Sequence, residues 1–450
     1  MNRKTVIAGV VFAGLVLVTI SLLHSPEKGN RPAEGGPRPV AKLKAGDFDT
    51  LEVTKGGATA VIKKEGQAYK VVKPVVYAAD NDAAKAAFES LEKMDFATIV
   101  SDQKSRHGEF EVGDKALRVV VKQGDKVLAD LHVGKSANDQ TMLRLEGKDE
   151  VWAATNLPRY QFDKDVAAWR DKSIATFDEK DAEKIEIESK TGGKIVLSKP
   201  APTDGGAPSE WRVVESAVKV EPLDKTVATG LISQMASWKA NDFADGAKPE
   251  ETGLQAPETK ITVSLKGGKQ VAVLVGKKKG DEDTYVKLAD QPQVFLVKKF
   301  NLDRVDKRPI EFRDKTMCDL TADELTEVAV VRDNDAYTIG KSGKDWKLVK
   351  PAGLTLDTSK TSSITSSFSD WKAQSFALDN SAQATGMAKP TAAITAKSNV
   401  KGHGCSLKVG GQTSDKNNYY VAVGGQPDVY VVPKWSVDRL LVKTDDLKKK

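Results

Sequence analysis

A domain-sized pattern occurs three times along the 450 residues of this chain. The segment Tyr69-Lys-Val-Val-Lys-Pro74 recurs as Trp211-Arg-Val-Val-Glu-Ser216 and as Trp346-Lys-Leu-Val-Lys-Pro351, at offsets of 211 − 69 = 142 and 346 − 211 = 135 residues. A Val-Gly pair keeps nearly the same spacing, at Val133-Gly134, Val275-Gly276 and Val409-Gly410. Because each unit is long enough to bury a core of its own, the sequence predicts three tandem modules instead of a solenoid of short repeats.

Each module is expected to begin with a β-hairpin, because alternating apolar residues flank a short turn. The first strands contain Leu51 and Val53, Ile185 and Ile187, and Val328 and Val330. The turns are expected at 56–57, 192–193 and 333–334. The aromatic residues Tyr69, Trp211 and Trp346 begin the next strand, where core packing is the favoured interpretation and a ligand groove is the alternative.

A main helix is expected after the aromatic strand, because apolar residues separated by four and then three positions lie on one helical face. These residues are Ala84, Phe88 and Leu91, then Leu231, Met235 and Trp238, then Ile364, Phe368 and Trp371. A closing helix is expected over 157–169, 300–312 and 435–442. The predicted fold class is α+β, with three tandem modules that each contain an antiparallel sheet, one main helix and a closing helix.

The N-terminal residues predict a membrane anchor. Residues 5–23 form an uncharged run that would span about 28 Å as a helix, enough to cross a bilayer once. No clear cleavage pattern follows, so an uncleaved anchor is favoured over a cleavable signal peptide. Arg3 and Lys4 precede the run, which favours a cytoplasmic N-terminus, a single pass through the inner membrane, and modules in the periplasm.

The predicted domain boundaries follow from these features. Residues 1–25 form the cytoplasmic head and transmembrane anchor, and residues 26–44 form a stalk because four prolines and three glycines fall there. The modules are expected at 45–172, 173–315 and 316–450.

Composition argues against a nucleic-acid partner. The 69 basic and 63 acidic residues give a net charge of only +6, and aromatic residues make up 6% of the chain. A nucleic-acid-binding protein is expected to concentrate basic and aromatic residues on one face. Gly134-Lys135-Ser136 resembles the end of a phosphate-binding loop, but the required earlier glycine is replaced by Ala129 and no helix is expected afterwards. We therefore expect no nucleotide and no nucleic acid.

No catalytic, cofactor-binding or metal-binding residue is assigned from the sequence, and no cofactor is expected. The four histidines, His24, His107, His132 and His403, have no partner at metal-ligand spacing. His403 lies near Cys405, but a flexible glycine turn explains it better than a nucleophile pair. Asp281-Glu282-Asp283 is interpreted as a solvated turn instead of a calcium site.

The two cysteines, Cys318 and Cys405, both fall in the third module. They are interpreted as two buried thiols or as one disulfide bond, and the sequence does not decide between them.

The repeated motifs resemble those of the bacterial domain-of-unknown-function (DUF) 4340 family, which is encoded near gliding-motility-type ABC transporters. The motifs are the aromatic-Lys-Val-x-Lys-Pro strand, the Gly-Leu-x-x-Pro turn at Gly253 and Pro257, the Val-Gly-Lys strand end, and the closing Arg-Asp-Lys at 170–172 and 313–315. The first module is expected to keep only Gly108 of the Gly-Leu-x-x-Pro turn, with Val112 in place of the proline. The resemblance implies a cell-envelope protein that acts with a transporter complex, and it implies no catalytic residues.

The sequence thus favours a non-catalytic interaction or scaffold protein that is anchored in the inner membrane. Its expected partner is an ABC transporter permease complex. The alternative is a periplasmic ligand-binding protein that holds a glycan, peptide or lipid in clefts between modules. An enzyme ranks third, and its expected sign is a polar cluster found in one module and absent from the other two.

Overall fold

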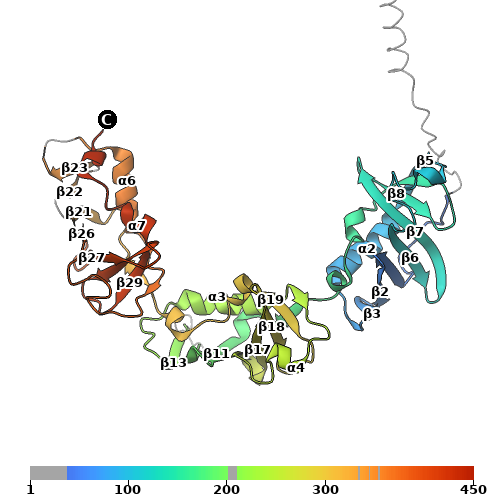
Figure 1. Cartoon of the computed structure of the whole chain (residues 1–450), viewed down its shortest axis with the longest axis horizontal. Coiled ribbons are helices and arrows are strands. Elements are labelled where there is room, and N and C mark those ends of the chain that lie inside the picture. Colours follow the sequence, from blue (N-terminus) through green and yellow to red (C-terminus); the bar gives the residue numbers. More distant parts are fainter. Residues whose placement is uncertain (1–37, 201–209, 333–334, 344, 353–354, 450) are drawn as a thin grey trace, which may run out of the picture. The chain divides into compact units, whose positions relative to one another are not determined.

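The computed structural model describes residues 38–200, 210–332, 335–343, 345–352 and 355–449. Figure 1 shows three large sheets with few helices, which agrees with the expected α+β class and with three repeated modules. The expected transmembrane segment at 5–23 and the turn at 333–334 lie outside the described residues. Within the described ranges, no helix is long and apolar enough to cross a membrane.

The first sheet has nine strands in the order β4-β3-β2-β1-β6-β7-β8-β9-β5. They are β1 (Thr50–Lys55), β2 (Ala58–Glu65), β3 (Ala68–Lys73), β4 (Tyr77–Ala78), β5 (Asp95–Ser101), β6 (Leu117–Gln123), β7 (Lys126–Ala137), β8 (Gln140–Leu145) and β9 (Val151–Thr155). Every pairing is antiparallel, as hairpin connections require. Strand β5 pairs with β9 at the sheet edge, and this strand was not expected from the sequence.

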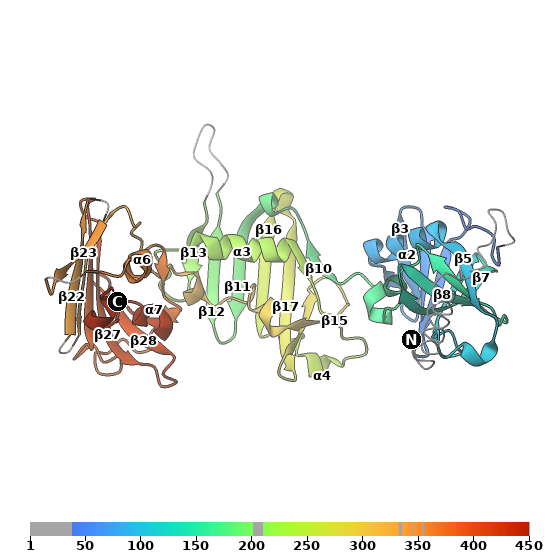
Figure 2. The same cartoon turned by 90° about the horizontal axis from the view of Figure 1, so that it is seen from above.

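The second sheet repeats this topology through the order β13-β12-β11-β16-β17-β18-β19. Its strands are β11 (Ala182–Ser189), β12 (Gly193–Ser198), β13 (Arg212–Ser216), β16 (Thr259–Leu265), β17 (Gln270–Lys279), β18 (Asp283–Leu288) and β19 (Phe295–Lys298). In Figure 2 the helix α3 (Lys225–Ala236) runs across these strands.

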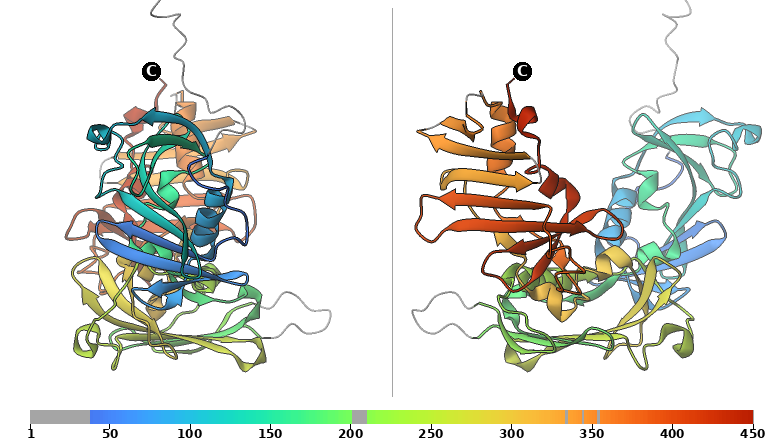
Figure 3. Two further views of the ribbon diagram at one scale, coloured as in Figure 1. Left: turned by 90° about the vertical axis from the view of Figure 1, so that its right-hand side faces the viewer. Right: turned by 60° about the vertical axis from the view of Figure 1, so that its left-hand side comes forward.

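The third sheet has the order β23-β22-β21-β26-β27-β28-β29-β25. Its strands are β21 (Leu325–Arg332), β22 (Asp335–Ser342), β23 (Asp345–Lys350), β25 (Ser375–Phe376), β26 (Ala392–Ser398), β27 (Gly404–Gln412), β28 (Asn418–Val423) and β29 (Val429–Pro433). The right-hand view of Figure 3 shows them in orange to dark red. Thus β1, β11 and β21 occupy equivalent positions in their own sheets. Each is flanked by its hairpin partner and by β6, β16 or β26, respectively.

Five further strands are short, and β15 among them is a member of the second sheet. They are β10 (Ser173–Thr176), β14 (Ser237–Lys239), β15 (Asp242–Phe243), β20 (Thr316–Cys318) and β24 (Trp371–Lys372). The described chain divides into two compact units, one with residues up to Ile174 together with Lys239–Asp245, and the other with Ala175–Trp238 and the residues from Gly246 onward.

Arg170 explains why the segment Lys239–Asp245 belongs to the first unit. Its guanidinium is buried, lies 3.6 Å from the centroid of the Phe243 ring and 4.7 Å from that of Tyr77, and pairs with Asp245. In the second unit, Arg313 stands at the repeat-equivalent position, lies over Phe376 and pairs with Asp428. A buried cation requires such a partner, since an unpaired buried charge is costly.

The main helices α2 (Asn81–Lys93), α3 and α6 (Thr358–Ser366) follow the aromatic strand of each module, as expected. Asp80, Asp224 and Asp357 cap their N-termini by accepting backbone N–H bonds, a signal present in the sequence. The expected apolar stripes are buried throughout. The expected helix lengths are wrong for two modules, because Trp238 and Trp371 lie in β14 and β24, and Phe368 follows the end of α6.

The closing helices are a second correction. The helices expected over 157–169 and 300–312 are each divided into two short helical turns, η2 (Arg159–Gln161) with η3 (Val166–Trp169), and α5 (Lys299–Leu302) with η6 (Pro309–Phe312). The helix expected over 435–442 is the shorter α7 (Lys434–Asp438), and η7 (Thr444–Leu447) follows beyond the expected range. In the second module Pro309 starts a new turn, because proline lacks the N–H that would continue a helix. The apolar anchors that were expected to lie on one helix, such as Phe162 and Trp169, are nevertheless fully buried.

The Val-Gly pairs lie inside strands, at a β-bulge in β7, β17 and β27. An added Cβ on Gly134 would lie 2.1 Å from the carbonyl oxygen of Phe110. The same atom on Gly276 and Gly410 would meet the carbonyls of Thr252 and Thr385 at 2.1 and 2.2 Å. Glycine therefore recurs because a loop backbone packs directly against the strand.

The aromatic anchors are part of the cores, as favoured from the sequence. Tyr69 and Trp211 are buried, and Trp346 is partly buried against the third core. Val40 and Leu43 are also buried in the first core, although residues up to 44 were assigned to the stalk. Cys318 in β20 and Cys405 in β27 form a disulfide bond, with Cα atoms 5.9 Å apart, which decides the alternative that the sequence left open.

Candidate interaction site in the first module

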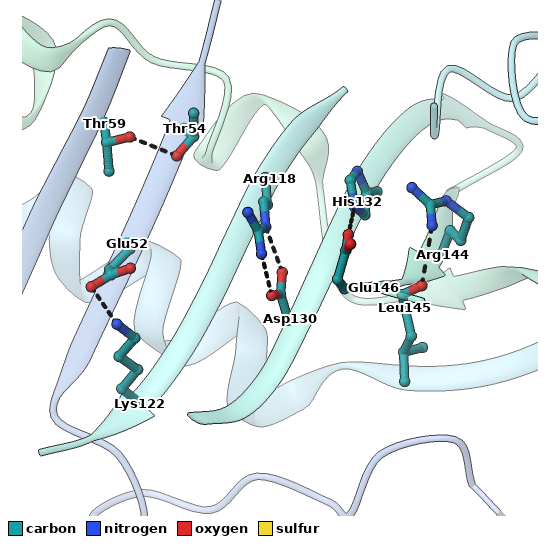
Figure 4. A network of polar contacts seen from close by, with 10 residues as sticks. All are labelled: Glu52, Thr54, Thr59, Arg118, Lys122, Asp130, His132, Arg144, Leu145 and Glu146. Atoms are coloured by element: carbon teal, nitrogen blue, oxygen red, sulfur yellow. Dashed lines mark hydrogen bonds and ion pairs between the residues drawn. The ribbon is translucent and has the colours of Figure 1, made fainter. Parts of the chain in front are cut away.

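The outer face of the first sheet carries a ladder of paired charges, shown in Figure 4. Lys122 Nζ donates to Glu52 at 2.5 Å, and Arg118 makes a two-point contact with Asp130 at 2.8 and 2.6 Å. Thr54 and Thr59 share a hydrogen bond of 2.8 Å on the same face. Successive side chains along a β-strand point to opposite faces of the sheet, which separates this polar face from the apolar core on the other side.

His132 and Arg144 are the buried members of the ladder. They lie directly opposite each other on β7 and β8, and Arg118 lies opposite His132 on β6. The His132 ring contacts the Glu146 carboxylate through Nε2, while Nδ1 is buried and has no hydrogen-bond partner among the described residues. The buried Nδ1 is unusual, since buried polar atoms normally have hydrogen-bond partners.

Arg144 connects the ladder to a loop that covers one end of the sheet. Its Nε donates to the carbonyl of Val112 at 2.7 Å, and Nη1 donates to the carbonyls of Leu145 and Lys148 at 3.4 and 3.3 Å. Val112 and Phe110 form a small second core with residues of β8 and β9. The buried guanidinium thus fixes the backbone next to Glu111.

Glu111 has a left-handed backbone, with φ of 58°. The carbonyl of the preceding residue packs on Gly134 in the first module, and Thr252 and Thr385 do the same in the others. Glu111 is therefore the equivalent of Gly253 and Gly386, whose φ values are 64° and 74°. A side chain in this conformation costs about 1 kcal/mol or more relative to glycine.

This equivalence corrects two expectations. The first module keeps the left-handed turn at Glu111, so Gly108 is not its counterpart of Gly253. Val112 then matches Leu254, and the position of Pro257 is occupied by Lys115. The sequence hides this position because glutamate stands where the other modules have glycine, whereas the packing of the loop on Gly134 identifies it.

Arg159 pairs with the strained residue. Its Nη1 donates to Glu111, and its Nε lies 3.3 Å from Asp163. Asp163 also lies 3.0 Å from Lys55 Nζ. The hydrogen bond from Lys55, together with the positive charge of Arg159, lowers the pKa of Asp163.

These residues border a pocket of 890 Å³ in the first module. Its lining consists of Glu111, Lys135, Ser136, Ala137, Asn138, Asp139, Thr141, Asn156, Leu157, Pro158, Arg159, Tyr160 and Asp163. No histidine or cysteine contributes to the lining among the described residues. Polar groups of both signs thus converge on one concave surface.

The other modules lack the Arg118–Asp130 pair and the Glu111–Arg159 pair, although the second sheet carries its own ion pairs, which join Lys184 and Lys194 to Glu186. Strand registers place Glu188, Lys260, Leu274 and Lys287 in the row of the second sheet that corresponds to Thr54, Arg118, His132 and Arg144. The same row of the third sheet contains Val331, Ala393, Lys408 and Ala422. The Glu111–Arg159 pair is replaced by Gly253 with Leu302 and by Gly386 with Val437. The first module is therefore specialised, and these substitutions were the sequence signal that could have located its site.

The motifs singled out from the sequence lie elsewhere or have structural roles, apart from Lys135 and Ser136 in the pocket lining. Gly134-Lys135-Ser136 lies within β7 and leads into a hairpin, not into a helix. His107 is buried and contacts the carbonyl of Asp149 at 2.9 Å. Cys405 is bonded to Cys318, so it forms no nucleophile pair with His403. Within the described ranges, no group of three or more metal-ligating side chains occurs.

Comparisons with known proteins identify one family. The alignment with a solved structure of the β subunit of DNA polymerase III from Pseudomonas aeruginosa covers 88% of this chain and 93% of that one, at 8% identity and a TM-score of 0.12, which is too low to indicate a shared fold. No curated protein matches the chain. A family model described as a domain of unknown function, DUF4340, matches residues 70–257 and 222–390, which together include most of the three repeated modules. The chain belongs to the DUF4340 family.

Proposed function

We propose that this chain is a membrane-anchored cell-envelope protein whose first module docks onto the permease of an ABC-type transporter, without catalytic activity of its own. The observation that carries the proposal is the ladder of Glu52, Arg118, Lys122 and Asp130, in which the Arg118–Asp130 pair is specific to the first module, since Ala272 and Ser406 occupy the Asp130 position in the other two sheets. Charges arranged on a fixed scaffold favour specific docking, since complementary charges select and orient a partner.

Two further observations support placement outside the cytoplasm. Residues 5–23 have the length and composition of one membrane-spanning helix. The Cys318–Cys405 disulfide is typical of proteins in oxidising compartments, such as the periplasm. The module order would then place the specialised first module next to the anchor.

The enzyme alternative predicts a polar cluster in one module alone, but charged residues also line a pocket of the second module, among them Asp303, Lys307 and Glu311. The chemistry of the cluster in the first module favours binding. Glu111 and Asp163 both pair with Arg159, and the pKa of Asp163 is lowered. A carboxyl that stays ionised is a poor proton donor at neutral pH. We therefore rank the interaction function above catalysis.

Docking can be tested by affinity purification of the full chain, tagged after Lys450, from membranes of its own host. We expect an ABC-transporter permease to be recovered with the wild type. The substitution Arg118→Glu places a second carboxylate beside that of Asp130 and should sharply reduce permease recovery. Because Arg118 is 44% exposed, its loss should change folding stability by only about 0 to 1 kcal/mol.

Lys260→Glu is the matched control, because Lys260 occupies the same register position in the second sheet. Permease recovery should be unchanged in this variant. The proposal fails if no permease is recovered above an untagged strain, or if Arg118→Glu and Lys260→Glu reduce recovery equally.

A further inference from the structure

The pocket of the first module gathers backbone conformations that are rare elsewhere in the chain. Six residues other than glycine have positive φ within the described ranges, and four of them line this pocket: Glu111, Asn138, Asp139 and Asn156. Asparagine and aspartate tolerate this conformation in turns, but glutamate is an uncommon choice. Asn138 and Asp139 form the two-residue turn between β7 and β8, which requires positive φ at both positions, so the conformation of Glu111 is the one that turn geometry does not explain.

Several polar side chains in the pocket are available to a ligand. Within the described part of the chain, the side chains of Asn138 and Asp139 make no hydrogen bond or ion pair. Ser136 and Thr141 bond only to each other, at 2.8 Å. The Asn156 amide donates to the Lys93 carbonyl at 3.3 Å and keeps its oxygen available. The lining thus offers both donors and acceptors.

The charges of the lining disfavour several classes of ligand. Glu111, Asp139 and Asp163 disfavour an anion, while Lys135 and Arg159 disfavour a cation. A lipid chain would leave these polar groups buried without partners, which is costly. A neutral ligand rich in hydroxyl groups fits the uncharged amide and hydroxyl side chains of the lining, because each hydroxyl both donates and accepts a hydrogen bond.

Tyr160 supplies an apolar platform at the edge of the pocket. Its side chain is 72% exposed, so the ring is accessible to a ligand in the pocket. The equivalent positions hold Asp303 and Asp438. An exposed aromatic ring beside planar amides and carboxylates matches a sugar ring, which has apolar C–H faces and a polar hydroxyl rim.

We propose that the pocket between the β7–β8 turn and η2 binds a neutral oligosaccharide. Tyr160 stacks on one sugar face, Asn138, Asp139 and Asn156 bond to the hydroxyl groups, and the Arg159–Glu111 pair forms a fixed floor. The pocket is separate from the residues used to test docking, so the two proposals can fail independently.

The test uses the full chain in phospholipid nanodiscs, which avoid sugar-based detergents. Maltotriose, cellotriose and N,N′,N″-triacetylchitotriose are titrated and observed by saturation-transfer NMR, with tri-lysine and tri-glutamate as charged probes. We expect at least one trisaccharide to bind and neither charged peptide to bind. Tyr160→Ala should weaken the trisaccharide about tenfold, through loss of stacking.

Two variants separate binding from folding. The double substitution Glu111→Gly with Arg159→Leu installs the residues of the second module, so the module should fold and lose sugar binding. Trp435→Ala removes an aromatic side chain that is 62% exposed in the third module and should leave binding unchanged. The inference is overturned if no trisaccharide binds at millimolar concentration, if Tyr160→Ala binds as well as the wild type, or if a charged peptide binds in place of the sugars.

Discussion

Reduction of the Cys318–Cys405 disulfide is expected to destabilise the third module and no other. The bond closes a loop of 87 residues between β20 and β27, and both cysteines are buried. The chain contains only these two cysteines, so the first two modules have no bond to lose. They therefore serve as an internal control within the same molecule.

The loop length sets the size of the effect. A cross-link that closes 87 residues lowers the entropy of the unfolded chain by an amount worth about 4.6 kcal/mol at 25 °C in the loop-closure relation. This free energy corresponds to a factor of roughly 2,000 in the unfolding equilibrium constant. Few other single changes in this chain are expected to have an effect of this size.

Hydrogen exchange measured by mass spectrometry resolves the modules separately. Peptides from β21 and β26 report on the third module, and peptides from β1 and β6 report on the first. On addition of reductant, protection of the most stable amides in β21 and β26 should fall by up to three orders of magnitude. The double variant Cys318→Ala with Cys405→Ala should show the same loss without reductant.

The reasoning would be refuted by equal protection of β21 and β26 in the oxidised and reduced proteins. It would also be refuted if β1 and β6 lost as much protection as the third module. In that case the effect would belong to the whole chain and not to the cross-linked loop.

Three further outcomes are expected. Trp211→Ala should destabilise the second module by about 3 to 5 kcal/mol in a urea titration, because the side chain is buried, and an unchanged midpoint would show that it is not. Burial raises the pKa of Asp306, so the wild type should lose stability as pH rises from about 4 through that pKa. Asp306→Asn should therefore be more stable than the wild type at pH 7. Equal melting temperatures of the wild type and Asp306→Asn at pH 7 would contradict this. A fluorescent reporter that matures only in the cytoplasm, fused after Lys450, should stay dark, and a bright fusion would reverse the proposed topology.

Asp163 and Asp306 show how tertiary surroundings change one repeated position. The two residues are equivalent in the first and second modules. The pKa of Asp163 is lowered by Lys55 and Arg159, whereas that of Asp306 is raised by burial. Arg159 is replaced by Leu302 in the second module, so the sequence contained the difference, but only the structure brings these side chains together.

Much of the fold was predictable because local patterns repeat. The hairpin at Gly56, the buried stripe that ends in Leu91, and the aromatic Tyr69 follow from alternation, helical spacing and recurrence. The ends of the helices were less predictable. Trp238 and Trp371 are buried, as Leu91 is at the equivalent position of the first module, but they lie in short strands. An apolar side chain can be buried from either a helix or a strand, so the recurrence predicted the burial and not the backbone conformation.

The candidate site was not predictable as a site. Glu111, Arg159 and Tyr160 are separated along the chain, and none belongs to a catalytic or ligand-binding motif. Alignment on glycine pointed to Gly108, since a left-handed turn normally selects glycine. The contact between the Phe110 carbonyl and Gly134 identified Glu111 as the residue that holds this turn.

The sequence alone determined that this chain repeats one α+β module three times, because hydrophobic spacing within each copy dictates which side chains are buried. The tertiary structure alone decided that the cysteines are bonded and that a polar pocket lies in the first module. The physical reason is that both depend on contacts between residues far apart along the chain, such as the 87 residues between Cys318 and Cys405. Periodicity describes which face of an element is buried, and packing of distant elements decides what that face meets.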